Sequence, residues 1–178
     1  MRVLNQTKMR EMARVTELKA YGILDTANEP IFDEIVKRAA CKFGAPIALI
    51  SLIDENRQWF KASHGLLPQE TPRTISFCTH AIRGSGVFVV EDARMDERFK
   101  ENPLVTDDPH IRFYAGAPLK THGGKRIGTL CIIDRVAREQ FSEADRVQLE
   151  QMALEVMTAI EARARTKTER AASGIHAS

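Results

Sequence analysis

A continuous apolar run, Ile47–Ile53, constrains the fold of this chain more than any other feature. It follows Pro46 and ends at a polar turn, Asp54–Asn56. Such a run is typical of a strand that is buried at the centre of a sheet. The next segment, Arg57–Ala62, predicts the returning strand of a hairpin. The sequence therefore predicts an antiparallel sheet with this run near its middle.

Three more strands are predicted further along the chain. Val87–Val90 is short, whereas Arg112–Leu119 and Ile127–Ile133 flank a glycine-containing hairpin turn, His122–Lys125. The strands are therefore spread over the middle of the chain, and their hairpin connections favour antiparallel pairing.

Two long stretches between these strands are polar and irregular, His64–Gly86 and Asp92–Pro109. They contain only short helical candidates, Phe77–Arg83 and a segment around Asp96–Lys100. A compact domain rarely keeps two structureless connections of such length unless they serve a function. We therefore expect the binding site near these connections.

Helices are predicted at both ends of the chain. A first one covers about Met9–Tyr21, and a second begins at Pro30, has an apolar face from Phe32 to Phe43 and ends at Gly44. The last begins with a capping-box-like pair, Ser142 and Asp145. Flanking helices around a hairpin-rich middle predict an α+β fold.

The last predicted helix carries an apolar seam. Its residues recur at alternating three- and four-residue steps, which is typical of a helix that packs against a partner helix. The seam predicts a homodimer interface and consists of Leu149, Met152, Val156 and Ala159.

Composition excludes several classes of protein. The length of 178 residues fits one domain. A net charge of +2 with mixed signs does not indicate a nucleic-acid binder.

There is no apolar run long enough to cross a membrane and no apolar signal segment at the start, so we expect a cytoplasmic protein without a membrane partner. Three cysteines without a C-x-x-C pair argue against a disulfide framework and a zinc site.

Several stretches, taken in their order and spacing, resemble the GAF domains of bacterial sensor kinases and cyclic-di-nucleotide signalling proteins. No single one of these motifs is specific, and together they run from about Leu18 to about Gln151. They are Tyr21–Thr26, Ile47–Phe60, Ser76–Ile82, Val90–Arg94, Arg98–Phe99, Asn102–Val105, Ile111–Leu119 and Gly128–Asp134.

The resemblance implies a central antiparallel sheet of about six strands. Terminal helices would pack on one face, and the long connections would cover a small-molecule pocket on the other. We expect one domain over residues 9–167 and a disordered tail over residues 168–178. The expected function is small-molecule sensing in signal transduction, without catalysis, in a homodimer that relays ligand occupancy to an output domain or a separate signalling partner.

Eight residues are candidates for contact with an unknown small-molecule ligand. They lie on the short helical candidate, after the third predicted strand and on the last two strands: Phe77, Cys78, His80, Asp92, Phe113, Tyr114, Gly116 and Cys131. Aromatic and small residues on a pocket floor suit a flat ligand. Ordinary core packing explains Cys78, His80, Phe113 and Tyr114 at least as well, and mutual ion pairing explains Asp92.

Two other functions remain open at this stage. In the first, the domain would be a dimerisation module without a ligand. In the second, it would reduce free methionine sulfoxide through Cys78 and Cys131. The latter is the less favoured, because the cysteine spacing of such reductases is not reproduced and Cys131 has apolar neighbours. His64, His110 and His122 lack the spacing of a zinc site, so we expect no metal and no cofactor. No kinase, cyclase or DNA-binding segment follows Arg170 in this sequence, so we expect either a stand-alone sensor with a separate partner or a piece of a larger protein.

Overall fold

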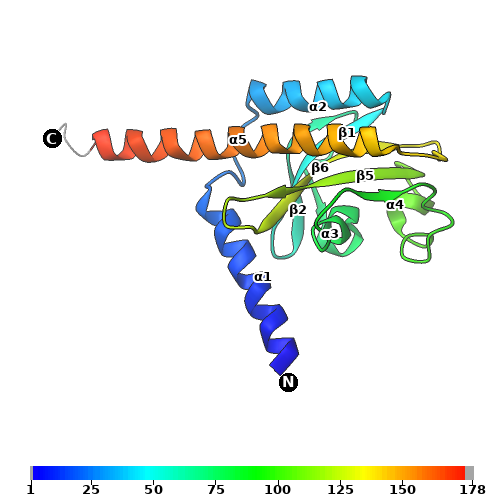
Figure 1. Cartoon of the computed structure of the whole chain (residues 1–178), viewed down its shortest axis with the longest axis horizontal. Coiled ribbons are helices and arrows are strands. Elements are labelled where there is room, and N and C mark those ends of the chain that lie inside the picture. Colours follow the sequence, from blue (N-terminus) through cyan, green and yellow to red (C-terminus); the bar gives the residue numbers. More distant parts are fainter. Residues whose placement is uncertain (1, 175–178) are drawn as a thin grey trace.

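The structure is a computed structural model that describes the backbone of residues 2–174 and the side chains of residues 5–173. A six-stranded antiparallel sheet lies at its centre (Figure 1), in the order β3-β2-β1-β6-β5-β4. This confirms the α+β class and the antiparallel sheet. The strands are β1 Ile47–Ile53, β2 Arg57–His64, β3 Glu70–Pro72, β4 Phe88–Val90, β5 Phe113–Lys120 and β6 Arg126–Asp134.

The apolar run forms the buried central strand that was predicted. Every residue of β1 is buried, and β1 pairs with β2 on one side and β6 on the other. The strand β3 escaped prediction, because it has only three residues and none of them is buried. It pairs with β2 through Arg57, Gln58 and Trp59.

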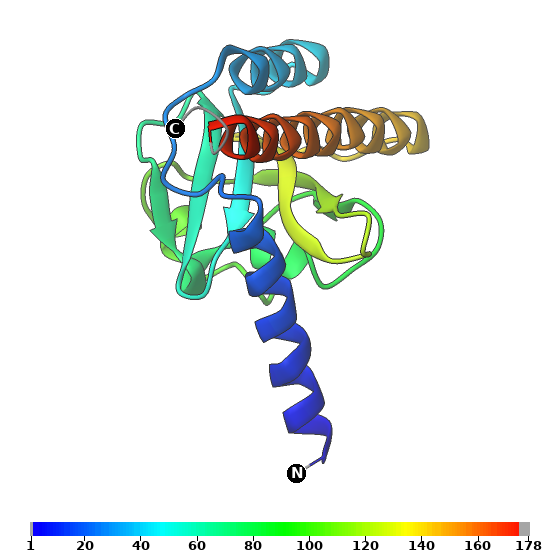
Figure 2. The same cartoon turned by 90° about the vertical axis from the view of Figure 1, so that its left-hand side faces the viewer.

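Two helices lie side by side on one face of the sheet (Figures 1 and 2). Helix α2, Pro30–Phe43, has Pro30 in its first turn and ends at Gly44, whose φ of 55° suits a left-handed cap. Helix α5, Glu143–Gly174, begins with the predicted capping box. The Ser142 Oγ accepts from the Asp145 backbone N–H, and the Asp145 carboxylate accepts from the Ser142 N–H.

The predicted dimer seam of α5 belongs to the monomer core. Leu149, Met152, Val156 and Ala159 are at most 8 % exposed and pack in one cluster with α2 and the sheet. The prediction that they face a partner helix is therefore wrong. The same spacing also marks the apolar stripe of a helix that packs on its own sheet, which is its role here.

Three predicted boundaries also change. Helix α5 continues to Gly174, so residues 168–174 are helical where a disordered tail was expected; residues 175–178 lie outside the described residues. The segment contains Glu169, Arg170, Ala171 and Ala172, residue types that favour helix. Helix α1, Arg2–Ala20, starts before the predicted Met9. Residues 96–100 form turns, and a helix forms instead at α4, Pro103–Thr106.

The opposite face of the sheet is covered by the two long connections. They carry a 3-10 turn, η1 (Arg73–Ile75), the short helix α3 (Phe77–Ala81) and α4. A second apolar cluster fills the space between them and the sheet. Helix α1 projects away from the body in both views (Figures 1 and 2). Among the described residues, no helix combines the length and hydropathy of a membrane span.

Candidate functional site

A cavity of about 400 Å³ lies where both long connections meet the sheet. This volume lies within the usual range of small-molecule sites. Strands β1, β2 and β6 form its floor, and the segments after β2 and around α4 form its walls. Its lining consists of Ile47, Leu49, Gln58, Phe60, Gly65, Leu66, Leu67, Pro68, Thr71, Leu104, Asp108, Pro109, Ile111, Ile133 and Arg135.

The floor is apolar because of strand alternation. Ile47 and Leu49 are two residues apart on β1 and so point to the same face, where Phe60 and Ile133 join them. All four side chains are buried. The intervening residues of β1, such as Ala48, belong to the cluster beneath α2 and α5. The same strand therefore serves the cavity on one face and the helix layer on the other.

Gln58 is the buried polar group of the cavity. Its Oε1 accepts from Ser51 Oγ (3.2 Å) and Ser76 Oγ (2.7 Å), and its Nε2 donates to Thr71 Oγ1 (2.7 Å). Ser76 in turn caps α3 by accepting from the Thr79 N–H (3.0 Å). Gln58 therefore ties the first long connection to the sheet at the cavity wall.

The mouth of the cavity is shaped by a glycine and framed by charge. Gly65 has a φ of 76°, and a Cβ there would lie 2.0 Å from the Pro46 carbonyl oxygen, so only glycine fits the turn. Leu67 beyond it is 98 % exposed. Across the mouth, Arg135 Nε donates to the Pro109 carbonyl (3.0 Å) and holds the second connection near β6.

Four of the eight predicted ligand contacts pack beside the cavity instead of lining it. Phe77, Cys78, Tyr114 and Cys131 are almost fully buried in the cluster between α3 and the sheet. The Cys78 and Cys131 sulfurs lie 3.9 Å apart, and the Tyr114 hydroxyl donates to the Cys78 sulfur (3.2 Å). The structure brings these four residues together, although they are not among the cavity-lining residues.

The two thiols have different proton affinities. Burial opposes a thiolate at Cys78, but hydrogen bonds from Cys131 and Tyr114 outweigh it and lower the pKa of Cys78. The hydrogen bond with Cys78, together with burial, raises the pKa of Cys131. Neither sulfur opens onto the cavity.

Gly116 and His80 also lie on this side of the sheet. A Cβ on Gly116 would lie 2.2 Å from the Tyr114 hydroxyl oxygen, so glycine leaves space for the tyrosine side chain rather than for a ligand. His80 packs edge-on against Phe99, with ring centroids 4.9 Å apart. Burial, followed by the charges of Arg83 and Arg98, lowers the pKa of His80.

Phe113 and Asp92 are placed away from the site. Phe113 points to the opposite face of the sheet and packs on Phe141, because successive residues of a strand alternate between faces. Its assignment to the pocket floor is wrong. The Asp92 carboxylate accepts from Arg94 Nη2 (2.7 Å), the ion pair that the alternating charges predicted.

None of the cavity-lining residues was predicted. The predicted contacts are mainly cysteine, histidine and aromatic residues, whereas the lining is mostly aliphatic. One signal was available in the sequence: Gln58 is a polar residue inside the strand that follows the apolar run. The position of Leu104 and Ile111 over the floor depends on how the second connection folds back, which no local pattern encodes. Among the described residues, no group of three histidine, cysteine or acidic residues could hold a metal.

Comparison with known proteins agrees with this architecture. A family model described as GAF domain matches residues 28–160. A curated relative from Pseudomonas aeruginosa, "Cyclic di-GMP phosphodiesterase PA2567", is 48% identical over 150 residues, which cover 84% of this chain. The match spans only 26% of that protein, about a quarter of its length.

Solved structures show the same fold at low sequence identity. The GAF domain of an Acinetobacter phosphoenolpyruvate-protein phosphotransferase is 20% identical, with a TM-score of 0.61 over 88% of this chain and 93% of that one. A free methionine-R-sulfoxide reductase from Neisseria meningitidis is 18% identical, with a TM-score of 0.62 over 83% and 87% of the two chains. The fold and the cavity place this chain among α+β domains with a covered sheet face. It belongs to the GAF domain family.

Proposed function

We propose that this domain senses a small, largely apolar molecule that binds in the cavity beneath the two long connections. Gln58 is the observation that carries the proposal. A glutamine side chain has two N–H donors and one acceptor oxygen. Among the described residues, the side-chain oxygen of Gln58 accepts from the hydroxyls of Ser51 and Ser76, and one of its N–H groups donates to Thr71. The remaining N–H suits an acceptor oxygen on an otherwise apolar ligand.

The cavity is suited to relay occupancy to the helices. Its floor strands β1 and β6 carry α2 and α5 on their other face, and its walls belong to both connections. A ligand transmits a signal only if it binds one arrangement of these elements better than another. The Pseudomonas relative is named as a phosphodiesterase. Its match with this chain covers 26% of the relative's length. We propose that the domain likewise passes its signal to an output domain or partner.

A thermal-shift screen against metabolites tests the proposal. A ligand at 100 times its Kd stabilises a protein by about 2.7 kcal/mol, which is readily measured. We expect stabilisation of the wild type, its loss in Leu66→Trp, which fills the cavity from the rim, and its retention in Ile31→Trp. Ile31 is 52 % exposed on α2, on the other face of the sheet. Equal stabilisation of Leu66→Trp and the wild type would place the ligand elsewhere.

Homodimerisation has a different candidate surface from the one predicted. Val147 and Leu154 are exposed large apolar residues, 43 % and 68 %, and lie two helical turns apart on the outer face of α5. We propose that a second copy packs on this face, parallel to the buried stripe. Leu154→Glu should give the monomer mass in sedimentation experiments, while Leu67→Glu, the same change on an exposed loop, should keep the dimer. A dimer that survives Leu154→Glu rules out this face.

A further inference from the structure

A second cleft, of about 600 Å³, lies between α1, the η1–α3 segment and the β5–β6 turn. It shares no lining residue with the cavity described above. Its charged side chains are one glutamate, Glu11, and six bases: Arg10, Arg14, Arg73, Arg83, Lys125 and Arg126. The whole chain has a net charge of only +2, so positive charge is concentrated in this cleft.

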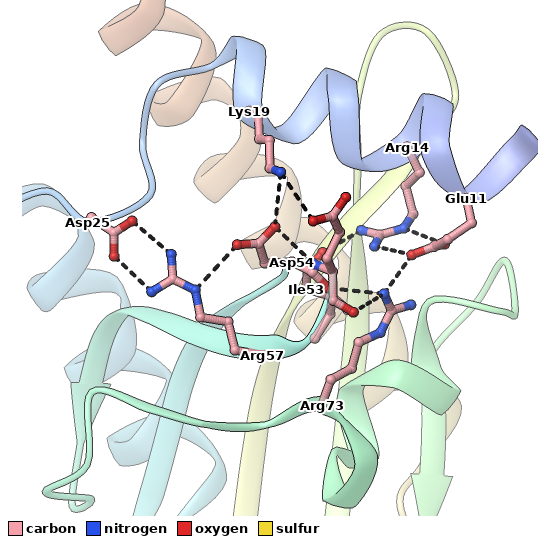
Figure 3. A network of polar contacts seen from close by, with 9 residues as sticks. Glu11, Arg14, Lys19, Asp25, Ile53, Asp54, Arg57 and Arg73 are labelled. Atoms are coloured by element: carbon pink, nitrogen blue, oxygen red, sulfur yellow. Dashed lines mark hydrogen bonds and ion pairs between the residues drawn. The ribbon is translucent and has the colours of Figure 1, made fainter. Parts of the chain in front are cut away.

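Some of these charges build the cleft. Figure 3 shows Glu11 of α1 between Arg14 and Arg73: it accepts from Arg14 Nη2 and from Arg73 Nη1, both at 2.6 Å. Arg14 also donates to the Ile53 carbonyl (2.7 Å). Arg126 Nε donates to the Ile82 carbonyl (2.7 Å). These contacts pair Glu11, the carboxylate of the cleft, with two arginines, and they join the three walls of the cleft to one another.

Three other bases have no counterion of this kind. Among the described residues, no carboxylate lies within ion-pair distance of Arg10, Arg83 or Lys125. These bases come from α1, from the turn after α3 and from the β5–β6 turn, yet they line the same cleft. Basic groups in a recess focus their field and attract anions. The arrangement therefore presents unpaired positive charge on three sides of one open cleft.

Thr79 carries a polar group without a partner at the wall of the cleft. Its Oγ1 is buried and has no hydrogen-bond partner among the described residues, although the side chain lines the cleft. Buried polar atoms are nearly always hydrogen-bonded, and each exception needs an explanation. Because less than 1 Å² of this oxygen is open to solvent, it would meet a ligand oxygen only after rotation of the Thr79 side chain toward the cleft.

We infer that this cleft binds the phosphate groups of a small phosphorylated molecule. Guanidinium groups match phosphate oxygens in a fork of parallel hydrogen bonds, which makes arginine the usual residue for such sites. The volume suits a compound of nucleotide size and is too small for a folded partner. The site is separate from the apolar cavity and does not depend on the sensing role proposed for it.

Calorimetric titration with inorganic pyrophosphate and with ATP, on the full chain, tests the inference. We expect saturable one-site binding of at least one probe. The triple variant Arg10→Glu, Arg83→Glu, Lys125→Glu should weaken it by about 100-fold, since three charge-assisted contacts are reversed. A triple variant with the same charge change elsewhere, Lys37→Glu, Lys42→Glu, Arg165→Glu, should bind like the wild type, because these exposed residues lie outside the cleft.

Thr79→Val separates a ligand-binding role from a structural one. The change removes an unpartnered hydroxyl, so the melting temperature should stay equal or rise, while phosphate affinity should fall by about 5-fold. Absence of binding by the wild type at millimolar probe would overturn the inference. So would equal affinity in the wild type and the cleft triple variant. Binding of an acidic peptide but of neither phosphate probe would also overturn it and assign the cleft to a protein partner.

Discussion

Gly128 lies where two backbones approach too closely for any side chain. A Cβ at this position would lie 2.0 Å from the Ser51 carbonyl oxygen, in the pairing of β6 with β1. We predict that Gly128→Ala lowers the free energy of unfolding by about 1–3 kcal/mol, because the strands must separate. Urea unfolding measures this loss. Gly84→Ala is the control, since its Cβ meets nothing closer than 3.8 Å and should change stability little.

Gln58 makes three hydrogen bonds, and two of them, with Thr71 and Ser76, hold the first connection on the sheet. Gln58→Leu keeps the volume but leaves the hydroxyls of Ser51 and Thr71 without their partner. We predict a loss of about 1–3 kcal/mol in unfolding free energy, together with loss of ligand binding. Gln151→Leu, an exposed position on α5, is the matched control for urea unfolding. A stable Gln58→Leu variant that binds ligand normally would contradict the role given to this side chain.

Residue chemistry also limited what the sequence could predict. The alternation of β5 separates Phe113 from Tyr114, and a period of two would have excluded Phe113 from the site. The contact between Cys78 and Cys131 could not be predicted from the sequence, because 53 residues and a folded connection separate them. The burial of an apolar strand can be predicted from its sequence, whereas the side chains that contact the strand depend on the tertiary fold.

At the scale of elements, α1 is held by charge as well as by the buried side chains of Val15 and Leu18. Glu11 joins Arg14 of its own helix to Arg73 of η1, and hydrogen bonds from Arg14 and then Arg73 lower the pKa of Glu11 to about 2 in spite of partial burial. A carboxylate with a lowered folded pKa stabilises the fold above its unfolded pKa of about 4.5, and this contribution disappears as the pH falls toward 2.

This linkage predicts a pH-dependent difference between the wild type and Glu11→Gln. The wild type should be more stable at pH 7, and the difference should shrink as the pH falls from 5 to 3, because only the wild type loses a charge. Urea midpoints at several pH values measure it, with Glu34→Gln on α2 as an exposed control. A difference that does not change with pH would mean that the Glu11 ion pairs do not hold α1.

Elements with a clear period were predicted well, and those without one were not. Helix α2 followed its apolar face and its terminal glycine, and β1 followed its apolar run. The seam of α5 was found, but its partner was the sheet of the same chain, because the spacing of an apolar stripe does not say what covers it. The strand β3 and helix α4 depend on distant residues. Strand β3 pairs with β2, and the Asn102 side chain that caps α4 also donates to the Ile75 carbonyl (3.0 Å).

At the scale of the molecule, one sheet separates two different environments. The face under α2 and α5 is a closed core, and the opposite face carries the cavity and, at the edge near α1, the basic cleft. A ligand in the cavity and a helix on the far face therefore contact the same strands. Under the proposed sensing role, this arrangement would connect a bound molecule with α2 and α5 through the strands that they share.

The most direct test of the sensing role is native mass spectrometry of the gently purified protein, before and after incubation with metabolite extract. We predict an added small-molecule mass on the wild type and on Ile31→Trp, and none on Leu66→Trp. Wild-type protein that stays at its bare mass after incubation, or an adduct that survives the filling of the cavity by Leu66→Trp, would contradict the account.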